Sequence, residues 1–94
     1  MSENEQDFPL PPASFGLLVA SLRAQAEFHL GMYPAEEDGK EPEANLPLAR
    51  HSIDMLAMLA EKTKGNLTLE EQRHLENSVT ELRFRFVQVS DKQS

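Results

Sequence analysis

Residues 68–89 combine a helix-start signal with a regular apolar repeat. Thr68-Leu69-Glu70-Glu71 has the pattern of a capping box, in which Thr68 accepts from the backbone of Glu71 and the Glu71 side chain reaches back. Behind it, apolar residues recur at steps of four, three, four and three: Leu75, Val79, Leu82, Phe86 and Val89. This heptad-like spacing predicts a helix over 69–89 that packs along one seam.

Residues 82–89 admit a second interpretation. Leu82, Phe84 and Phe86 alternate with other side chains, a pattern that also suits a strand. No other segment resembles a partner strand, and a lone strand leaves its backbone groups without hydrogen bonds. We therefore expect the helix to continue, to fray at its end, and to be followed by a disordered tail over 90–94.

A first helix is predicted over 15–31. Ser14 is a favourable N-cap, and Gly31 provides a C-terminal stop. Between them, apolar side chains fall on one stripe at helical spacing: Phe15, Leu18, Val19, Leu22, Ala26 and Leu30.

A middle helix is predicted over 46–64. Asn45 is a suitable N-cap, and Pro47 is tolerated in the first turn of a helix. Gly65 follows the predicted end, where a left-handed residue commonly closes a helix. The short turn between Gly65 and Thr68 then predicts that the middle and last helices form an antiparallel hairpin.

The acidic charge is confined to two segments. Residues 1–13 and 32–45 together hold eight acidic residues against one lysine, which equals the formal net charge of −7. Five of the six prolines also fall there. Because prolines and blocks of like charge oppose regular structure, we expect a disordered acidic tail over 1–13 and an acidic linker over 32–45.

Length and composition bound the rest of the molecule. Ninety-four residues form one small domain, and the absence of cysteine excludes disulfides, thiol catalysis and Cys-ligated metal sites. We expect an all-α domain over 14–89, folded as a three-helix antiparallel bundle. No segment approaches the ~18 apolar residues of a membrane span, and the acidic start of the chain is unlike a secretory signal. The sequence therefore predicts a cytoplasmic protein.

The helices carry more apolar surface than one small bundle needs. On a helical wheel the apolar residues of the middle helix cover an arc of roughly 200°, about twice what a surface helix buries. The first helix carries a second apolar stripe opposite its main one. The surplus favours self-association, as a homodimer or higher oligomer, or an unidentified protein partner. The candidate interface residues are Leu17, Ala20, Ala24, Phe28, Met55 and Leu59. An alternative is that the middle helix is flanked on both sides within one chain.

The chain also carries motifs that look like one known pattern. They are Asn45-Leu46-Pro47-Leu48-Ala49-Arg50, Ile53-Asp54-Met55-Leu56, Glu61-Lys62-Thr63-Lys64-Gly65-Asn66-Leu67-Thr68 and Glu81-Leu82-Arg83. Over roughly Phe15 to Val89 the sequence resembles the bacterial family known as domain of unknown function 1844. The resemblance implies a small helical cytoplasmic protein, and the family has no established activity, ligand or partner to carry over.

Catalytic and metal-binding patterns are sparse. Glu71 and His74 form the Glu-x-x-His step found in di-iron helical bundles. Such a site needs two further inward carboxylates, whereas Glu27 and Asp54 project from polar arcs, and Glu71 is needed in the cap. No Gly-x-Ser-x-Gly elbow or phosphate-binding glycine loop occurs. We therefore expect no enzyme activity, no metal and no cofactor.

An alternative function is that of a nucleic-acid-linked accessory protein. Arginines alternate with aromatic residues over 83–86, as on single-strand binding surfaces. The alternative uses four basic residues: Arg83, Arg85, Lys62 and Lys64. Because the last helix opens with two carboxylates and the chain is acidic, contact with phosphates is disfavoured. We therefore favour an interaction or scaffold protein.

Overall fold

Three helices make up most of the structure. The computed structural model describes residues 9–33, 39 and 42–93. In chain order the helices are α2 (Phe15–His29), α3 (Leu46–Lys62) and α4 (Leu69–Gln93). The described ranges contain no strand, which confirms the all-α prediction, and 82–89 lies within α4. Within these ranges, no helix is both long enough and apolar enough to cross a bilayer.

α2 and α3 each begin at a side-chain cap. Ser14 has an extended backbone, and its Oγ accepts from the Leu17 N–H at 3.1 Å. Asn45 plays the same part for α3, where its Oδ1 accepts from the Leu48 N–H at 3.1 Å. Because each cap satisfies an amide that lacks a partner within the helix, these short polar residues fix where the helices start.

α2 ends at His29, two residues before the end predicted for the helix over 15–31. Gly31 has a φ of 80°, and the Met32 N–H donates to the carbonyl oxygen of Glu27 at 2.9 Å. This is the bonding pattern of a Schellman motif, in which the left-handed residue lies beyond the last helical residue. Gly31 therefore closes the helix from outside it.

α3 ends at Lys62, also two residues before the end predicted for the helix over 46–64. Thr63 is the C-cap, and its Oγ1 donates to the carbonyl oxygen of Leu59 at 2.7 Å. The backbone then tightens into a turn that contains Gly65, whose φ is 84°. The Leu59 carbonyl thus accepts from both the Thr63 hydroxyl and the Thr63 N–H, the latter at 3.0 Å.

The capping box at the start of α4 is fully formed. The Glu71 N–H donates to Thr68 Oγ1 at 3.1 Å, and the Thr68 N–H donates to Glu71 Oε1 at 2.9 Å. Two amides that would lack partners are thus satisfied reciprocally. This local device fixes the start of the longest helix.

The predicted end of the last helix needs correction. α4 continues past 69–89 to Gln93, so most of the disordered tail predicted over 90–94 is helical. No proline or glycine interrupts α4, and Lys92 in its last turn complements the helix dipole. Ser94 lies outside the described residues.

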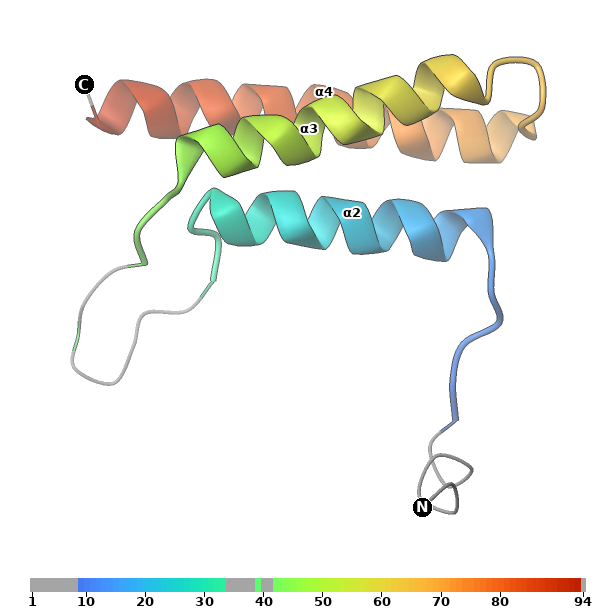
Figure 1. Ribbon diagram of the computed structural model, residues 1–94, viewed down its shortest axis with the longest axis horizontal. Coiled ribbons are helices and arrows are strands. Elements are labelled where there is room, and N and C mark those ends of the chain that lie inside the picture. The colour runs from blue at the N-terminus through green and yellow to red at the C-terminus, as the bar shows by residue number, and fades with distance from the viewer. Residues whose placement is uncertain (1–8, 34–38, 40–41, 94) are drawn as a thin grey trace.

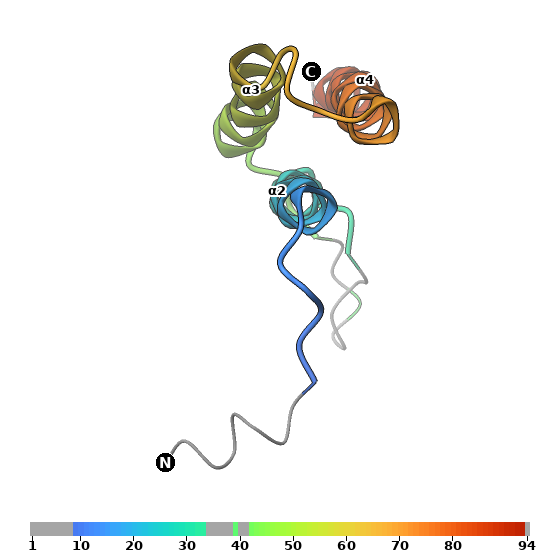
Figure 2. The ribbon, with the colours of Figure 1, turned by 90° about the vertical axis from the view of Figure 1, so that its right-hand side faces the viewer.

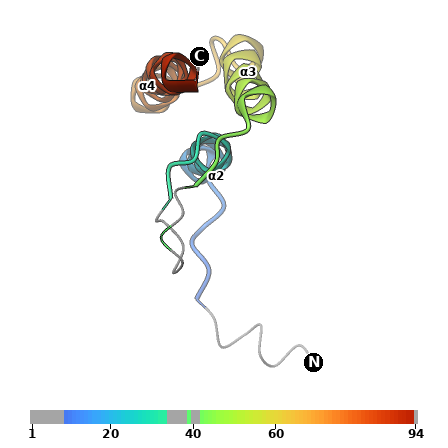
Figure 3. The same ribbon diagram turned by 90° about the vertical axis from the view of Figure 1, so that its left-hand side faces the viewer.

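The three helices pack as an up-down-up bundle. α3 runs antiparallel to both α2 and α4, so α2 and α4 point the same way (Figure 1). Seen from either end, the helices form a triangle, with α3 and α4 side by side and α2 against both of them (Figures 2 and 3). The antiparallel bundle is confirmed, and α3 is flanked on two sides within one chain.

The core lies along the axis of this triangle. Leu56, Leu75 and Leu82 are its largest fully buried apolar residues. The buried apolar side chains of the described residues come from all three helices and from Leu30: Val19, Ala26, Leu30, Ala49, Ile53, Leu56, Leu75, Val79 and Leu82. Phe86 and Val89 pack against this core, so the whole seam of α4 contributes to it.

The predicted acidic tail and linker fall largely outside the described residues. The tail is described only from residue 9, and 9–13 are exposed and form no helix or strand. Residues 34–38, 40 and 41 of the linker are not described. Near its end, the Asn45 N–H donates to the carbonyl oxygen of His29 at 2.7 Å. This bond joins the start of α3 to the end of α2.

Candidate interaction surface

α2 presents an apolar face to solvent on the side opposite the core. This α2 outer face consists of Leu17, Ala20, Ser21, Ala24 and Phe28, all of which are exposed. Leu17 is 39% exposed and Phe28 is 58% exposed. At roughly 100° per residue, these side chains point away from buried Val19 and Ala26. Four of the predicted interface residues, Leu17, Ala20, Ala24 and Phe28, therefore share one surface.

The α2 outer face contains no charged side chain. The formal charges of α2 are Arg23 and Glu27, and they pair with each other at 2.9 Å on the side that faces α4. The solvent-facing side of a helix is normally polar or charged. The outer face of α2 is instead apolar, and its side chains are exposed among the described residues.

Phe28 is held in place at the C-terminal end of this face. Its ring stacks on Tyr33 with centroids 4.8 Å apart and planes 18° apart. It also meets the His29 ring edge-on at 5.6 Å. Such aromatic pairs stabilise a defined ring orientation. The exposed ring is therefore a preorganised apolar surface.

The two predicted interface residues of α3 have different environments. Met55 is exposed, whereas Leu59 packs against the core. Leu59 is only partly buried, so part of its side chain faces the core and part faces solvent; α3 is flanked by two helices, which cover much of its wide apolar arc. The alternative stated above, a middle helix flanked on both sides within one chain, therefore accounts for much of the surplus apolar surface of α3.

Leu18 is more exposed than its place on the main apolar stripe of α2 predicts. The sequence assigns it to the buried stripe of the first helix, but it is 46% exposed. It immediately precedes Val19 in the chain and therefore lies roughly 100° from it around the helix, on the flank that faces α3. Met58 on α3 is also exposed. The angular distance of Leu18 from the centre of the stripe could have indicated from the sequence that this side chain is exposed.

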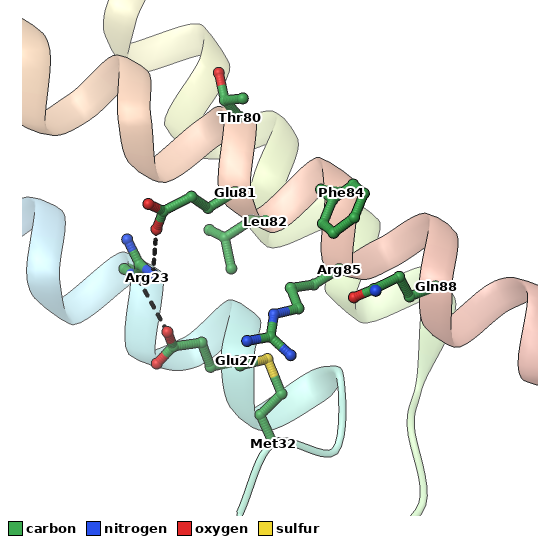
Figure 4. A pocket seen from close by; sticks show the side chains of 9 residues that line it. All are labelled: Arg23, Glu27, Met32, Thr80, Glu81, Leu82, Phe84, Arg85 and Gln88. Carbon is green, nitrogen blue, oxygen red and sulfur yellow. Dashed lines mark hydrogen bonds and ion pairs between the residues drawn. The ribbon is translucent and has the colours of Figure 1, made fainter.

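A polar cluster that the sequence does not reveal joins α2 to α4. The Arg23 guanidinium donates to Glu27 at 2.9 Å, to Glu81 at 2.6 Å and to the buried Ser78 hydroxyl at 3.3 Å. The Glu27 hydrogen bond, with that to Glu81 and the charge of both carboxylates, raises the pKa of Arg23 despite its partial burial. Figure 4 shows both carboxylates directed at this guanidinium.

The Arg23 cluster lines one side of a groove of about 660 Å³ between α2 and α4. Arg85 also points into this groove, near Met32 (Figure 4). Among the described residues Arg85 makes no ion pair. The lining carries two arginines and two glutamates, so its formal charge balances, and the exposed ring of Phe84 lines the same groove.

The four basic residues of the nucleic-acid alternative do not share one surface. Arg85 lines the groove toward α2, whereas Arg83 lines grooves between α3 and α4. Lys62 and Lys64 lie at the far end of α3, about 20 Å along the bundle from these arginines at ~1.5 Å per residue. The two arginines thus line different grooves, and the two lysines lie far from both.

Side chains of the metal-binding type are dispersed. Glu71 is engaged in its cap with Thr68, and His74 is exposed. No group of three or more His, Cys, Asp or Glu side chains within 9–33, 39 and 42–93 gathers around a point that could hold a metal ion.

The sequence was compared with models of known protein families. The family model described as "Domain of unknown function (DUF1844)" matches residues 12–88. The chain belongs to this family. The DUF1844 match includes α2, α3 and most of α4, so the α2 outer face, the Arg23 cluster and the turn at Gly65 all lie inside the family domain. No curated protein and no solved structure matches this DUF1844 chain.

Proposed function

We propose that this DUF1844 protein is a non-enzymatic protein-interaction module that associates with itself through the α2 outer face. The observation that carries the proposal is an exposed helix face without charge, in a chain of which 27% of residues are charged. Exposed helix faces are normally polar, and contiguous exposed apolar patches mark interaction sites. The proposed role requires no metal or cofactor.

The surface extends beyond the α2 outer face. Leu18 on α2 and Met55 and Met58 on α3 are all exposed, and Leu18 and Met55 lie on the flanks where their helices meet. Methionine side chains adapt readily to a partner surface.

A charge placed on the α2 outer face tests the proposal. Ala24→Glu adds a carboxylate at an exposed helical position, where it disturbs no buried contact of a single chain. Asn77→Glu is the matched control, because it adds the same charge at an exposed position of α4. Sedimentation velocity at tens of micromolar measures the molar mass, and circular dichroism checks the helix content.

The parent and Asn77→Glu should sediment as oligomers, and Ala24→Glu as a monomer with unchanged helicity. The oligomer should persist in high salt, because apolar association survives salt whereas phosphate binding weakens steeply. A parent that stays monomeric at these concentrations would remove the proposal. Salt-sensitive retention on nucleic acid would favour the basic residues instead.

A further inference from the structure

We infer that two copies pair through their α2 outer faces with the α2 helices antiparallel and crossing between Ser21 and Ala24. This inference rests on the proposed function and specifies its partner, a second copy of the chain, and its geometry. It follows from the order of side-chain sizes along the face and from the way the chain leaves the helix.

The α2 outer face has large side chains at its ends and small ones in its middle. Leu17 and Phe28 lie at the two ends, with Ala20, Ser21 and Ala24 between them. Small residues let two helix backbones approach closely at a crossing point, and large ones fill the space where the helices diverge. The face therefore fits a second helix that crosses it obliquely at the centre.

The course of the chain also favours an oblique crossing. The described residues 9–13 leave the N-terminal end of α2 on the side turned away from α3 and α4 (Figures 1 and 2). A partner helix that lay along the full length of α2 would meet this segment. A partner that crosses near Ser21 and Ala24 avoids it.

The antiparallel orientation makes the two ends of the contact equal. About a two-fold axis between residues 22 and 23, Leu17 lies opposite Phe28 of the partner copy, and this pair occurs at both ends. A parallel pair would place two Phe28 rings at one end and two Leu17 side chains at the other, which separates the helices unevenly. The electrostatic interaction between the two helix dipoles is also favourable only in the antiparallel pair.

A second copy is the partner whose chemistry matches this face. A charged partner surface would lose its hydration against the α2 outer face without gaining an ion pair, because the face offers no charge. Another α2 outer face brings no such charge. A closed two-fold contact also uses the same surface on both copies and leaves none unpaired.

Engineered cysteines distinguish the geometries, and the natural chain contains no cysteine that would interfere. In the antiparallel pair, the Cα atoms of two copies of residue 21 lie about 5 Å apart along the helix axis, and those of residue 17 about 16 Å apart. A disulfide needs Cα atoms within about 7 Å. Three single variants are oxidised separately: Ser21→Cys, Leu17→Cys and Phe28→Cys. The Leu17→Cys and Phe28→Cys proteins are also mixed and oxidised together. The control is Asp54→Cys, at an exposed position of α3.

The inference predicts that Ser21→Cys forms a covalent dimer on non-reducing gels, and that the Leu17→Cys and Phe28→Cys mixture forms a mixed dimer. Leu17→Cys alone, Phe28→Cys alone and Asp54→Cys should stay at background. Cross-linking of Leu17→Cys and Phe28→Cys each to itself would show a parallel pair and overturn the inference. A parent that sediments as a dimer while no α2 cysteine reacts above the control would also overturn it, leaving self-association intact through another face. A monomeric parent would remove the proposed function itself.

Discussion

Two glycines with left-handed backbones differ in their surroundings. Gly31 and Gly65 have φ values of 80° and 84°, which side chains with a Cβ rarely adopt. A Cβ at Gly31 would lie 3.4 Å from the carbonyl oxygen of Pro42, whereas a Cβ at Gly65 would meet nothing within 4 Å. Backbone strain therefore acts at both positions, and the added Cβ at Gly31 would only be in ordinary van der Waals contact with the linker backbone.

We therefore expect both Gly→Ala substitutions to destabilise the fold by similar amounts, because the strained backbone conformation is common to both. Each substitution should lower the free energy of unfolding by about 1 kcal/mol or more. Urea unfolding followed by circular dichroism measures both. Alanines that leave the stability unchanged at both positions would contradict the strain argument, and a much larger cost at Gly31 would show that its contact with the Pro42 carbonyl is repulsive.

Because Thr68 caps α4, we expect Thr68→Ala to lower the free energy of unfolding by about 1 kcal/mol. The substitution removes the Oγ1 acceptor of the Glu71 amide and leaves the reverse bond from the Thr68 N–H in place. Thr68→Ser keeps the acceptor and serves as the control. Chemical denaturation of the two variants should separate them, and equal stabilities would contradict the capping interpretation.

Among the elements, α2 is joined to α4 by polar contacts as well as by the core. Arg23 links Glu27 on its own helix to Glu81 and Ser78 on α4. Because the buried Ser78 hydroxyl and two carboxylates converge on one guanidinium, the cluster specifies one register between two parallel helices. An apolar contact between α2 and α4 would tolerate small slides that this cluster opposes.

We expect Arg23→Met to lower stability by less than about 1 kcal/mol, because the ion pairs of Arg23 are partly exposed and water screens them. The pKa of Arg23 is raised in the folded state, so its contribution is present at all pH values below the ordinary pKa of arginine and is lost only in strongly alkaline solution. Urea unfolding at low and high salt should show the cost of Arg23→Met shrinking with salt. Arg85→Met, in the same groove, is the control, and a salt-independent loss would point to packing instead.

For the whole molecule, self-association should link stability to concentration. A partner that binds only the folded state stabilises it by mass action, so the midpoint of thermal unfolding should rise as protein concentration rises. Ala24→Glu should unfold at one temperature at all concentrations, whereas Asn77→Glu should behave like the parent. Melting curves across a hundredfold concentration range measure this difference. A parent midpoint that does not move would contradict coupled folding and association.

The surface of the bundle shows where prediction from sequence reached its limit. The outward position of Leu17 and Phe28 followed from their place opposite the main stripe of α2. The exposure of Leu18 and the partial burial of Leu59 did not, because both lie at the edge of an apolar arc. Whether such an edge is covered depends on which side the neighbouring helix packs against, and no local pattern records that choice.

The sequence by itself determined the number of helices, their starts and the seam of α4. Caps act within four residues and apolar periodicity acts within two turns, so Ser14, Asn45 and Thr68 carry their information locally. Only the tertiary structure decided that Arg23 meets Glu81 and that neither α3 nor α4 covers the outer face of α2. Those outcomes depend on the register and rotation of helices separated by tens of residues, which are set by packing of the whole core rather than by any one segment.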